Sequence, residues 1–275
     1  MESTKLKNFI IVLLLLLNLV FLFFVGHQER QSRQYEASTR ENTTKILKNN
    51  GIDLLEDIIP WEDDLPPLKV TRDREREAQL AQELLGEVQA PRDTGFVLYE
   101  GARGKLHISR SGEFTLTLNE PEPAGDNWQE SALTLLRGLD FQGQVIHAEL
   151  LGNGGKRATI WQVLDGHPVF NCQVEANWDA NGLLELEGRR LNGKAEEDAA
   201  GGSRLEVTTL IIRFLDGLRE RDTTCSEIRS ITPGYLYAAG LTPYATLTPA
   251  WYLETDNGDY LLDCTSGKLS LLQEN

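Results

Sequence analysis

The side chains that could do chemistry in this sequence are its histidines, its cysteines and its many carboxylates. No two of the four histidines, His27, His107, His147 and His167, have the H-x-x-x-H or H-x-x-E-H spacing that places metal ligands on one helix face. His167 and Cys172 are close in sequence, but a separation of five puts them on opposite faces of a regular strand. The sequence therefore predicts neither a metal site nor a local Cys–His dyad.

Two kinds of loop resemble ligand-binding loops only superficially. Gly152 to Lys156 is too short for a phosphate loop and lacks the Ser or Thr that would hold Mg²⁺. Asp179–Gly182 and Asp256–Asp259 carry carboxylates, but neither continues to the distal Glu of a calcium loop. We interpret all three as turns. Among 42 acidic residues no local pattern selects a glycosidase pair, although a wall-directed hydrolase with such a pair in a groove stays an alternative. With no catalytic constellation in the sequence, we predict a protein that is not an enzyme and uses no cofactor.

The overall charge argues against a nucleic-acid partner. The chain has 27 basic and 42 acidic residues and a net charge of −15, whereas nucleic-acid binding uses Lys and Arg to neutralise phosphates. Cys172, Cys225 and Cys264 are too few and too scattered for a disulfide framework or a zinc site. One bridge with a free thiol and three free, half-buried thiols both fit this pattern.

Residues 9–25 form an apolar run that decides where the chain resides. A helix over this run is roughly 26 Å long, which is close to the hydrocarbon thickness of a bilayer. Lys5 and Lys7 precede it, so the positive-inside rule places residues 1–8 in the cytoplasm and the rest outside. A cleaved signal peptide is the alternative, but residues 23–28 show no A-x-A cleavage pattern. We therefore predict a retained single-pass anchor in the cell membrane.

Asn18 is the one polar residue within this run. It is either a polar residue that the lipid-facing surface tolerates or a donor to a partner transmembrane helix, a bond typically worth about 0.6 to 2 kcal/mol. Helical spacing selects the other residues on its face. The resulting candidate partner-binding face consists of Ile11, Leu14, Leu15, Asn18, Phe21, Leu22 and Val25.

Hydrophobic periodicity predicts the elements that follow. The first region, residues 26–122, begins with a membrane-proximal helix that ends at Gly51, followed by a short strand at residues 52–59 and an acidic, proline-rich linker at residues 60–67. It continues with a helix at residues 74–85 ended by Gly86, and with strands at residues 96–99, 105–108 and 114–118.

The region from residue 123 to 275 shows two markers with the same spacing. Asn127 and Ser203 each begin a capping-box pattern before an amphipathic helix, 76 residues apart (203 − 127). Asn181-Gly182 and Asn257-Gly258 each lie between alternating runs typical of a hairpin, again 76 residues apart (257 − 181). The spacing predicts duplicated helix-plus-sheet units at about residues 127–200 and 203–275; chance is the alternative, since both markers are common.

The arrangement resembles the YycH/YycI family, and more closely its YycI-like regulatory proteins of Gram-positive bacteria. Asp165-Gly166-His-Pro-Val-Phe-Asn171 is similar to the family's G-x-P-(I/V)-F strand, and Thr248-Pro-Ala-Trp-Tyr-Leu253 to its P-x-W strand. Residues 260–267 resemble the strand and turn that follow. The chain departs from the family in a Gly/Ala-rich insertion at residues 195–202 and in its three cysteines. The resemblance implies an α+β protein in which a transmembrane helix precedes tandem PepSY-like helix-plus-antiparallel-sheet units.

The same resemblance implies a function without catalysis. Family members adjust a sensor histidine kinase of the WalK (YycG) type, which controls cell-wall metabolism, through contacts of their transmembrane helices and of their extracytoplasmic domains. It implies that kinase, together with a YycH-like companion, as the partners of this chain. The alternative is an extracytoplasmic protease inhibitor or ligand-binding module of PepSY type.

Overall fold

The computed structural model describes residues 17, 37–54, 58–61, 65–88, 92–93, 96–121, 127–182, 184–240 and 244–272. It contains two compact units, Met1–Glu56 and Asp57–Asn275. Apart from Leu17, the predicted anchor lies outside the described residues, and so does its whole candidate face: Ile11, Leu14, Leu15, Asn18, Phe21, Leu22 and Val25. Among the described residues, no helix has both the length and the apolar character that a membrane crossing requires.

In the first unit, residues 37–49 form a helix that ends as predicted at Gly51. Gly51 has φ +76°, its N–H donates to the Lys48 carbonyl at 3.0 Å, and the Ile52 N–H donates to the Leu47 carbonyl at 3.1 Å. This is the Schellman pattern, in which glycine accepts the left-handed conformation. The strand predicted at residues 52–59 is wrong in length: among the described residues of this range β1 covers Asp53–Leu54, and a tight turn bonds the Trp61 N–H to the Ile59 carbonyl.

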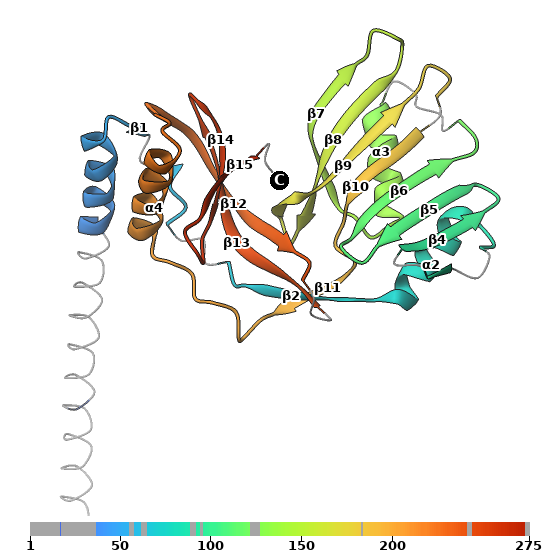
Figure 1. Ribbon diagram of the computed structural model, residues 1–275, viewed down its shortest axis with the longest axis horizontal. Coiled ribbons are helices and arrows are strands. Elements are labelled where there is room, and N and C mark those ends of the chain that lie inside the picture. The colour runs from blue at the N-terminus through green and yellow to red at the C-terminus, as the bar shows by residue number, and fades with distance from the viewer. Residues whose placement is uncertain are drawn as a thin grey trace, which may run out of the picture. The chain divides into compact units, whose positions relative to one another are not determined.

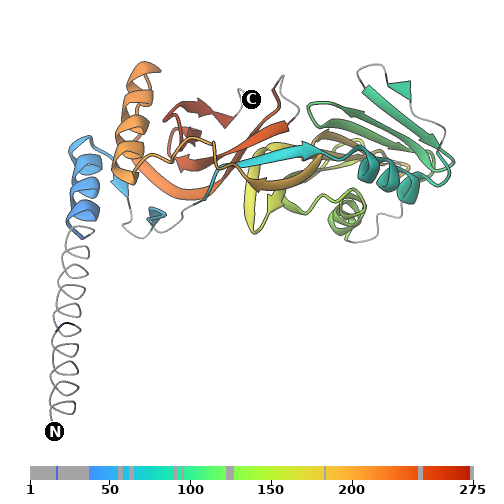
Figure 2. The same ribbon diagram turned by 90° about the horizontal axis from the view of Figure 1, so that it is seen from below.

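The strands of the second unit form one connected sheet with two antiparallel parts, which we call the first and the second sheet. The strand order of the first sheet is β7-β8-β9-β10-β6-β5-β4-β3. Two helices, α2 (Arg74–Leu85) and α3 (Trp128–Arg137), cover one of its faces, as Figures 1 and 2 show. Its strands are β3 (Arg92–Asp93), β4 (Phe96–Gly101), β5 (Gly104–Ser109), β6 (Glu113–Leu118), β7 (Gly143–Leu150), β8 (Lys156–Leu164), β9 (His167–Trp178) and β10 (Leu184–Arg189).

Alternation along these strands builds the core beneath the two helices. Every second residue points toward the helices, so that Leu106, Leu116 and Leu186 are buried while their neighbours along each strand face the other side. Helix α2 occupies the predicted residues, begins at Asp73, whose carboxylate accepts from the Arg76 N–H at 2.9 Å, and ends at Gly86. The result is a sheet with one face covered by helices and one face open.

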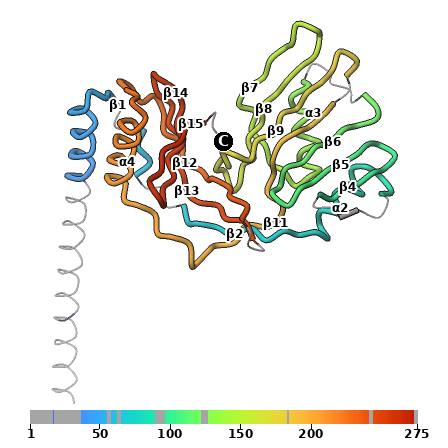
Figure 3. Tube along the Cα trace, viewed as in Figure 1, coloured from blue at the N-terminus to red at the C-terminus, as the bar shows by residue number. Residues whose placement is uncertain are grey.

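The second sheet combines a meander with two strands from elsewhere in the chain. Its meander, which Figure 3 traces in orange and red, is β12 (Glu227–Ala238), β13 (Tyr244–Thr255), β14 (Gly258–Asp263) and β15 (Leu269–Leu271). Strand β2 (Leu68–Arg72) pairs with β13, and β11 (Gly193–Glu197) pairs with β2. Helix α4 (Val207–Glu220) packs against this sheet, where Phe214 meets Tyr260 edge to face at 6.1 Å.

The duplication stays a prediction, and the 76-residue spacing on which it depends does not relate equivalent strands. Each of α3 and α4 is followed by four antiparallel strands in a meander. Both Asn-Gly pairs form the predicted hairpin turns, yet one joins the third and fourth strands of its meander and the other joins the second and third. The 76-residue distance between the two Asn-Gly turns is therefore not the length of a structural repeat.

The predicted helix caps are also corrected. Helix α4 begins at Val207, not after Ser203, because the Leu205 N–H donates to the Cys264 carbonyl at 2.8 Å and holds this segment against the sheet. The Asn127 side chain precedes α3 as predicted but makes no capping hydrogen bond. Part of the Gly/Ala-rich insertion at residues 195–202 is the end of β11, so it extends the second sheet.

The two sheets meet at a narrow seam between β9 and β12. Only one bridge pair, Val169 with Tyr235, joins these strands, and it is parallel. The seam is reinforced by the Asn171 amide, which donates to the Tyr237 carbonyl at 2.7 Å and accepts from the Tyr237 N–H at 2.8 Å. A side chain thus makes the two bonds that a neighbouring strand would otherwise make.

Candidate partner-binding groove

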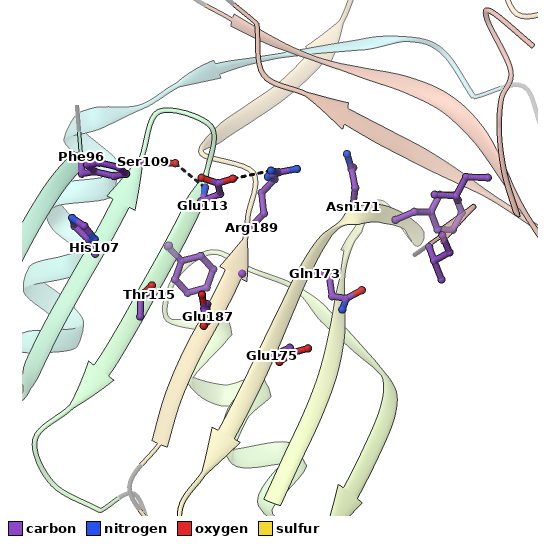
Figure 4. Close-up of a pocket in the computed structure, with 15 residues that line it drawn as sticks. Phe96, His107, Ser109, Glu113, Thr115, Asn171, Gln173, Glu175, Glu187 and Arg189 are labelled. Atoms are coloured by element: carbon purple, nitrogen blue, oxygen red, sulfur yellow. Dashed lines mark hydrogen bonds and ion pairs between the residues drawn. The ribbon is translucent and has the colours of Figure 1, made fainter. Parts of the chain in front are cut away.

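A groove of about 920 Å³ lies on the open face of the first sheet. Figure 4 shows its lining side chains, which rise from β4, β5, β6, β9 and β10. At the seam end, Phe170, Leu261 and Leu272 complete the lining, and the last two come from the second sheet and the residue after it. A volume of this size is at the upper end of the range for ligand-binding clefts.

The strand register fixes which groove residues are neighbours. In the central row, His107 is opposite Thr115, Thr115 is opposite Glu187, and Glu187 is opposite Glu175. All four side chains lie on the open face and are exposed or half-buried, as alternation requires. The floor of the groove therefore holds two carboxylates directly opposite each other on β9 and β10.

The rows on either side of this central row contain ion pairs, although Glu185, in one of them, has none among the described residues. In the row nearer the β5–β6 turn, Arg189 donates to Glu113 at 2.9 Å. On the other side, Lys105 pairs with Glu100 at 2.9 Å, and Arg157 pairs with Glu149 at 3.6 Å. Among the described residues, no ion pair reaches Glu175 or Glu187. In the central row, Glu175 and Glu187 are thus two like charges directly opposite each other without a cation.

The rim opposite the seam is aromatic. Phe96 is 49% exposed, and its ring centroid lies 4.9 Å from that of His107. Ser109 is buried nearby, where its hydroxyl bonds Ser111 at 2.8 Å and accepts from the Glu113 N–H at 3.1 Å. These bonds hold the β5–β6 turn, and with it Glu113, in place. The groove therefore combines an aromatic rim with a fixed polar wall.

The seam end of the groove is rigid and apolar. Phe170 packs between Trp161, at 5.4 Å between ring centroids, and Tyr252, at 5.8 Å. Gly234 on β12 lies so close that an added Cβ would be 2.3 Å from the Pro168 carbonyl oxygen and 2.8 Å from the Phe170 ring. Only a residue without a side chain permits this approach. The aromatic cluster fixes Phe170, which forms part of the groove wall.

The residues that carry the family resemblance build this seam. Asp165 and Gly166 have φ +49° and +87° and form the tight turn between β8 and β9. Val169 makes the bridge to β12, Phe170 lines the groove and Asn171 holds Tyr237. The sequence alone does not show what this stretch does, because the strand that it contacts lies more than sixty positions away.

The groups that suggested chemistry in the sequence do not assemble into one site. His107 reaches the groove, whereas His147 and His167 lie on β7 and at the start of β9. Within the part of the chain that the structure describes, no group of three metal-ligating side chains occurs. The residues from Gly152 to Lys156 form the turn expected between β7 and β8, with the Gly155 N–H donating to Asn153.

The three cysteines are free thiols, which settles the alternative that the sequence left open. All three are buried, not half-buried as the sequence suggested. Burial is the main cause that raises the pKa of Cys172 to about 12 and that of Cys225 to about 11. Thiols so far from ionisation are poor nucleophiles at neutral pH, so Cys172 and Cys225 have a packing role.

The fold and groove define a mixed α+β protein with two joined antiparallel sheets and an open sheet face. No protein-family model matches the chain, and no curated protein sequence matches it either. Solved structures that it resembles include YycH from Bacillus subtilis, with 12% identity and a TM-score of 0.39 over 75% of this chain and 52% of that one.

Two further solved structures share this likeness. The C-terminal domain of YpeB from Bacillus megaterium has 10% identity and a TM-score of 0.38, over 74% of this chain and 99% of that domain. An uncharacterized protein from Eubacterium rectale has 11% identity and a TM-score of 0.48, over 76% of this chain and 86% of that one. At these identities and scores, no residue role is transferred from any of the three.

Proposed function

We propose that this protein is a membrane-anchored, extracytoplasmic regulator of a sensor histidine kinase of the WalK (YycG) type, which controls cell-wall metabolism. In this proposal it is not an enzyme and acts by protein–protein contact, with its N-terminus in the cytoplasm and the second unit outside. The kinase is the partner, together with a YycH-like companion. Contacts form both in the membrane, through the face around Asn18, and outside it.

The observation that carries the proposal is the groove on the open face of the first sheet. A sheet face left uncovered, hollowed to about 920 Å³ and bordered by an exposed aromatic ring is typical of a surface that receives a partner. The resemblance in sequence names the class of partner, and the residues that carry that resemblance form the seam end of this groove. The groove and the sequence resemblance, the two lines of support, therefore involve the same residues at the seam.

Co-purification with the kinase tests the proposal. The full-length protein is compared with a version in which residues 9–25 are replaced by an unrelated transmembrane helix, and with a Glu175→Gln, Glu187→Gln variant of the groove. We expect each change to reduce the amount of kinase recovered. Undiminished recovery after the helix replacement would refute the contact in the membrane, and undiminished recovery in all variants would refute the proposal.

The second candidate, a protease inhibitor or ligand-binding module of PepSY type, is supported by the same groove. It differs in needing no contact within the membrane. If the helix replacement leaves partner recovery unchanged while the groove variant abolishes it, and the recovered partner is a protease, this second function replaces the first.

A further inference from the structure

Among the described residues of the open sheet face, Glu175, Glu185 and Glu187 have no ion pair, and Glu175 and Glu187 are directly opposite each other. Like charges directly opposite in an antiparallel pair raise the free energy of the folded sheet. The rows on either side show that this sheet can place cations beside its carboxylates, since Arg189 pairs with Glu113 and Lys105 with Glu100. Glu175 and Glu187 therefore lack, in the described part of the chain, a cation that would offset their repulsion.

We propose that the groove binds an extended, arginine-bearing segment of a partner protein, whose guanidinium bridges Glu175 and Glu187. Residues opposite in an antiparallel ladder have Cα atoms about 4.5–5.5 Å apart, a span that the planar, five-donor guanidinium can cover while bonding both carboxylates. An ammonium group is a single point charge and would bond both less well. The inference rests on the proposed function only in taking a protein as the occupant.

The remainder of the groove suits a polypeptide on either side of that arginine. Toward the seam, Phe170, Leu261 and Leu272 offer an apolar wall for one neighbouring side chain. Toward the rim, the exposed Phe96 ring beside His107 offers a surface for another. Gln173 and Thr115 flank the carboxylates and can bond an extended backbone. Apolar side chains on either side of a central cation fit this order of contacts.

Peptide binding to the purified full chain tests the inference. The probe is a short fluorescent peptide that alternates valine with arginine, and its control carries citrulline, which keeps the shape of arginine without its charge. We expect the arginine peptide to bind and the citrulline peptide not to. In the Glu175→Gln, Glu187→Gln variant, the dissociation constant of the arginine peptide should rise at least about tenfold, because two charge-assisted hydrogen bonds are lost.

A charge-matched variant separates the groove from the general attraction of an acidic protein. Glu197→Gln with Glu220→Gln removes two exposed carboxylates away from the groove and lowers the net negative charge equally. We expect this variant to bind the arginine peptide as the unmodified chain does. Equal weakening in both double variants, or no binding by the unmodified chain at millimolar peptide, would overturn the inference.

Thermal unfolding provides a second readout. Because neutralising Glu175 and Glu187 relieves a repulsion, the groove variant should unfold at the same temperature as the unmodified chain or a higher one. A clear decrease would show that the carboxylates stabilise the fold and would count against a binding role. If peptide binding behaves as expected but kinase recovery does not change, the groove inference holds and the proposed function fails.

Discussion

At the scale of single residues, Asn171 shows how one side chain can join two sheets. Its amide makes both a donor and an acceptor bond to the backbone of Tyr237, and it is half-buried where water can replace these bonds only in part. Asn171, the last residue of the family-like motif, therefore serves to bind the backbone of β12, a strand distant in sequence. The motif joins the two sheets, and its residues Phe170 and Asn171 line the groove.

We predict that Asn171→Ala lowers the free energy of unfolding by about 1–3 kcal/mol, because it leaves the N–H and carbonyl of Tyr237 without their partner. Urea denaturation measures the change. Asn177→Ala is the matched control, since Asn177 lies on the same strand and accepts a hydrogen bond from a side chain, that of Arg157, at 3.0 Å. If both variants lose the same stability, the two hydrogen bonds between Asn171 and Tyr237 do not contribute more to stability than an ordinary side-chain bond.

Two buried titratable groups near the seam predict a loss of stability in alkali. Burial raises the pKa of Cys172 from 9.0 to about 12 and that of Tyr237 from 10.0 to about 12. Since the folded state favours the protonated forms, their contribution is complete below about pH 9 and is lost as the pH rises toward 12.

The free energy of unfolding should therefore fall between pH 9 and pH 11, by at most about 1.4 kcal/mol per pH unit for each group. Urea titrations at several pH values measure this slope. Cys172→Ala should reduce the slope while lowering stability at pH 7 through the cavity it leaves. A slope that is the same with and without the thiol would contradict the assignment.

At the scale of elements, local chemistry decides where helices and turns end, and tertiary contacts decide the exceptions. The helix before Gly51, helix α2 and both Asn-Gly hairpins occur where their capping and turn residues predict. The start of α4 is shifted because a hydrogen bond to Cys264 competes with the first helical turn. Ser203 had the right residue type for a cap but not the right surroundings.

The approach of β12 to β9 provides a test at this scale. Gly234→Ala should lower the free energy of unfolding by about 1–3 kcal/mol or more, because its Cβ would overlap the Pro168 carbonyl and the Phe170 ring. Gly152→Ala is the control: it lies in an exposed turn where a Cβ meets nothing within 4 Å, and its effect should stay within about 0.5 kcal/mol. Equal effects in chemical denaturation would mean that the strands can separate freely at the seam.

At the scale of the whole molecule, the anchor and the groove are two separate proposed contacts. Asn18→Leu tests the first without altering the second unit. The variant should still fractionate with membranes, because leucine is more apolar than asparagine, and it should recover less kinase if Asn18 bonds a partner helix. Unchanged kinase output in cells carrying the variant would support the alternative, that lipid merely tolerates Asn18.

The sequence by itself determined where several helices and turns lie, since these follow from periodicity and from residues such as Gly51, Gly86 and Asn181. It also set the charge that makes nucleic acid a poor partner. It could not reveal that Glu175 and Glu187 face each other, or that Asn171 reaches Tyr237, because pairing between strands distant in sequence depends on register and topology. The 76-residue spacing shows the same limit, for turn chemistry is local, whereas which strands a turn joins is decided by the assembled sheet.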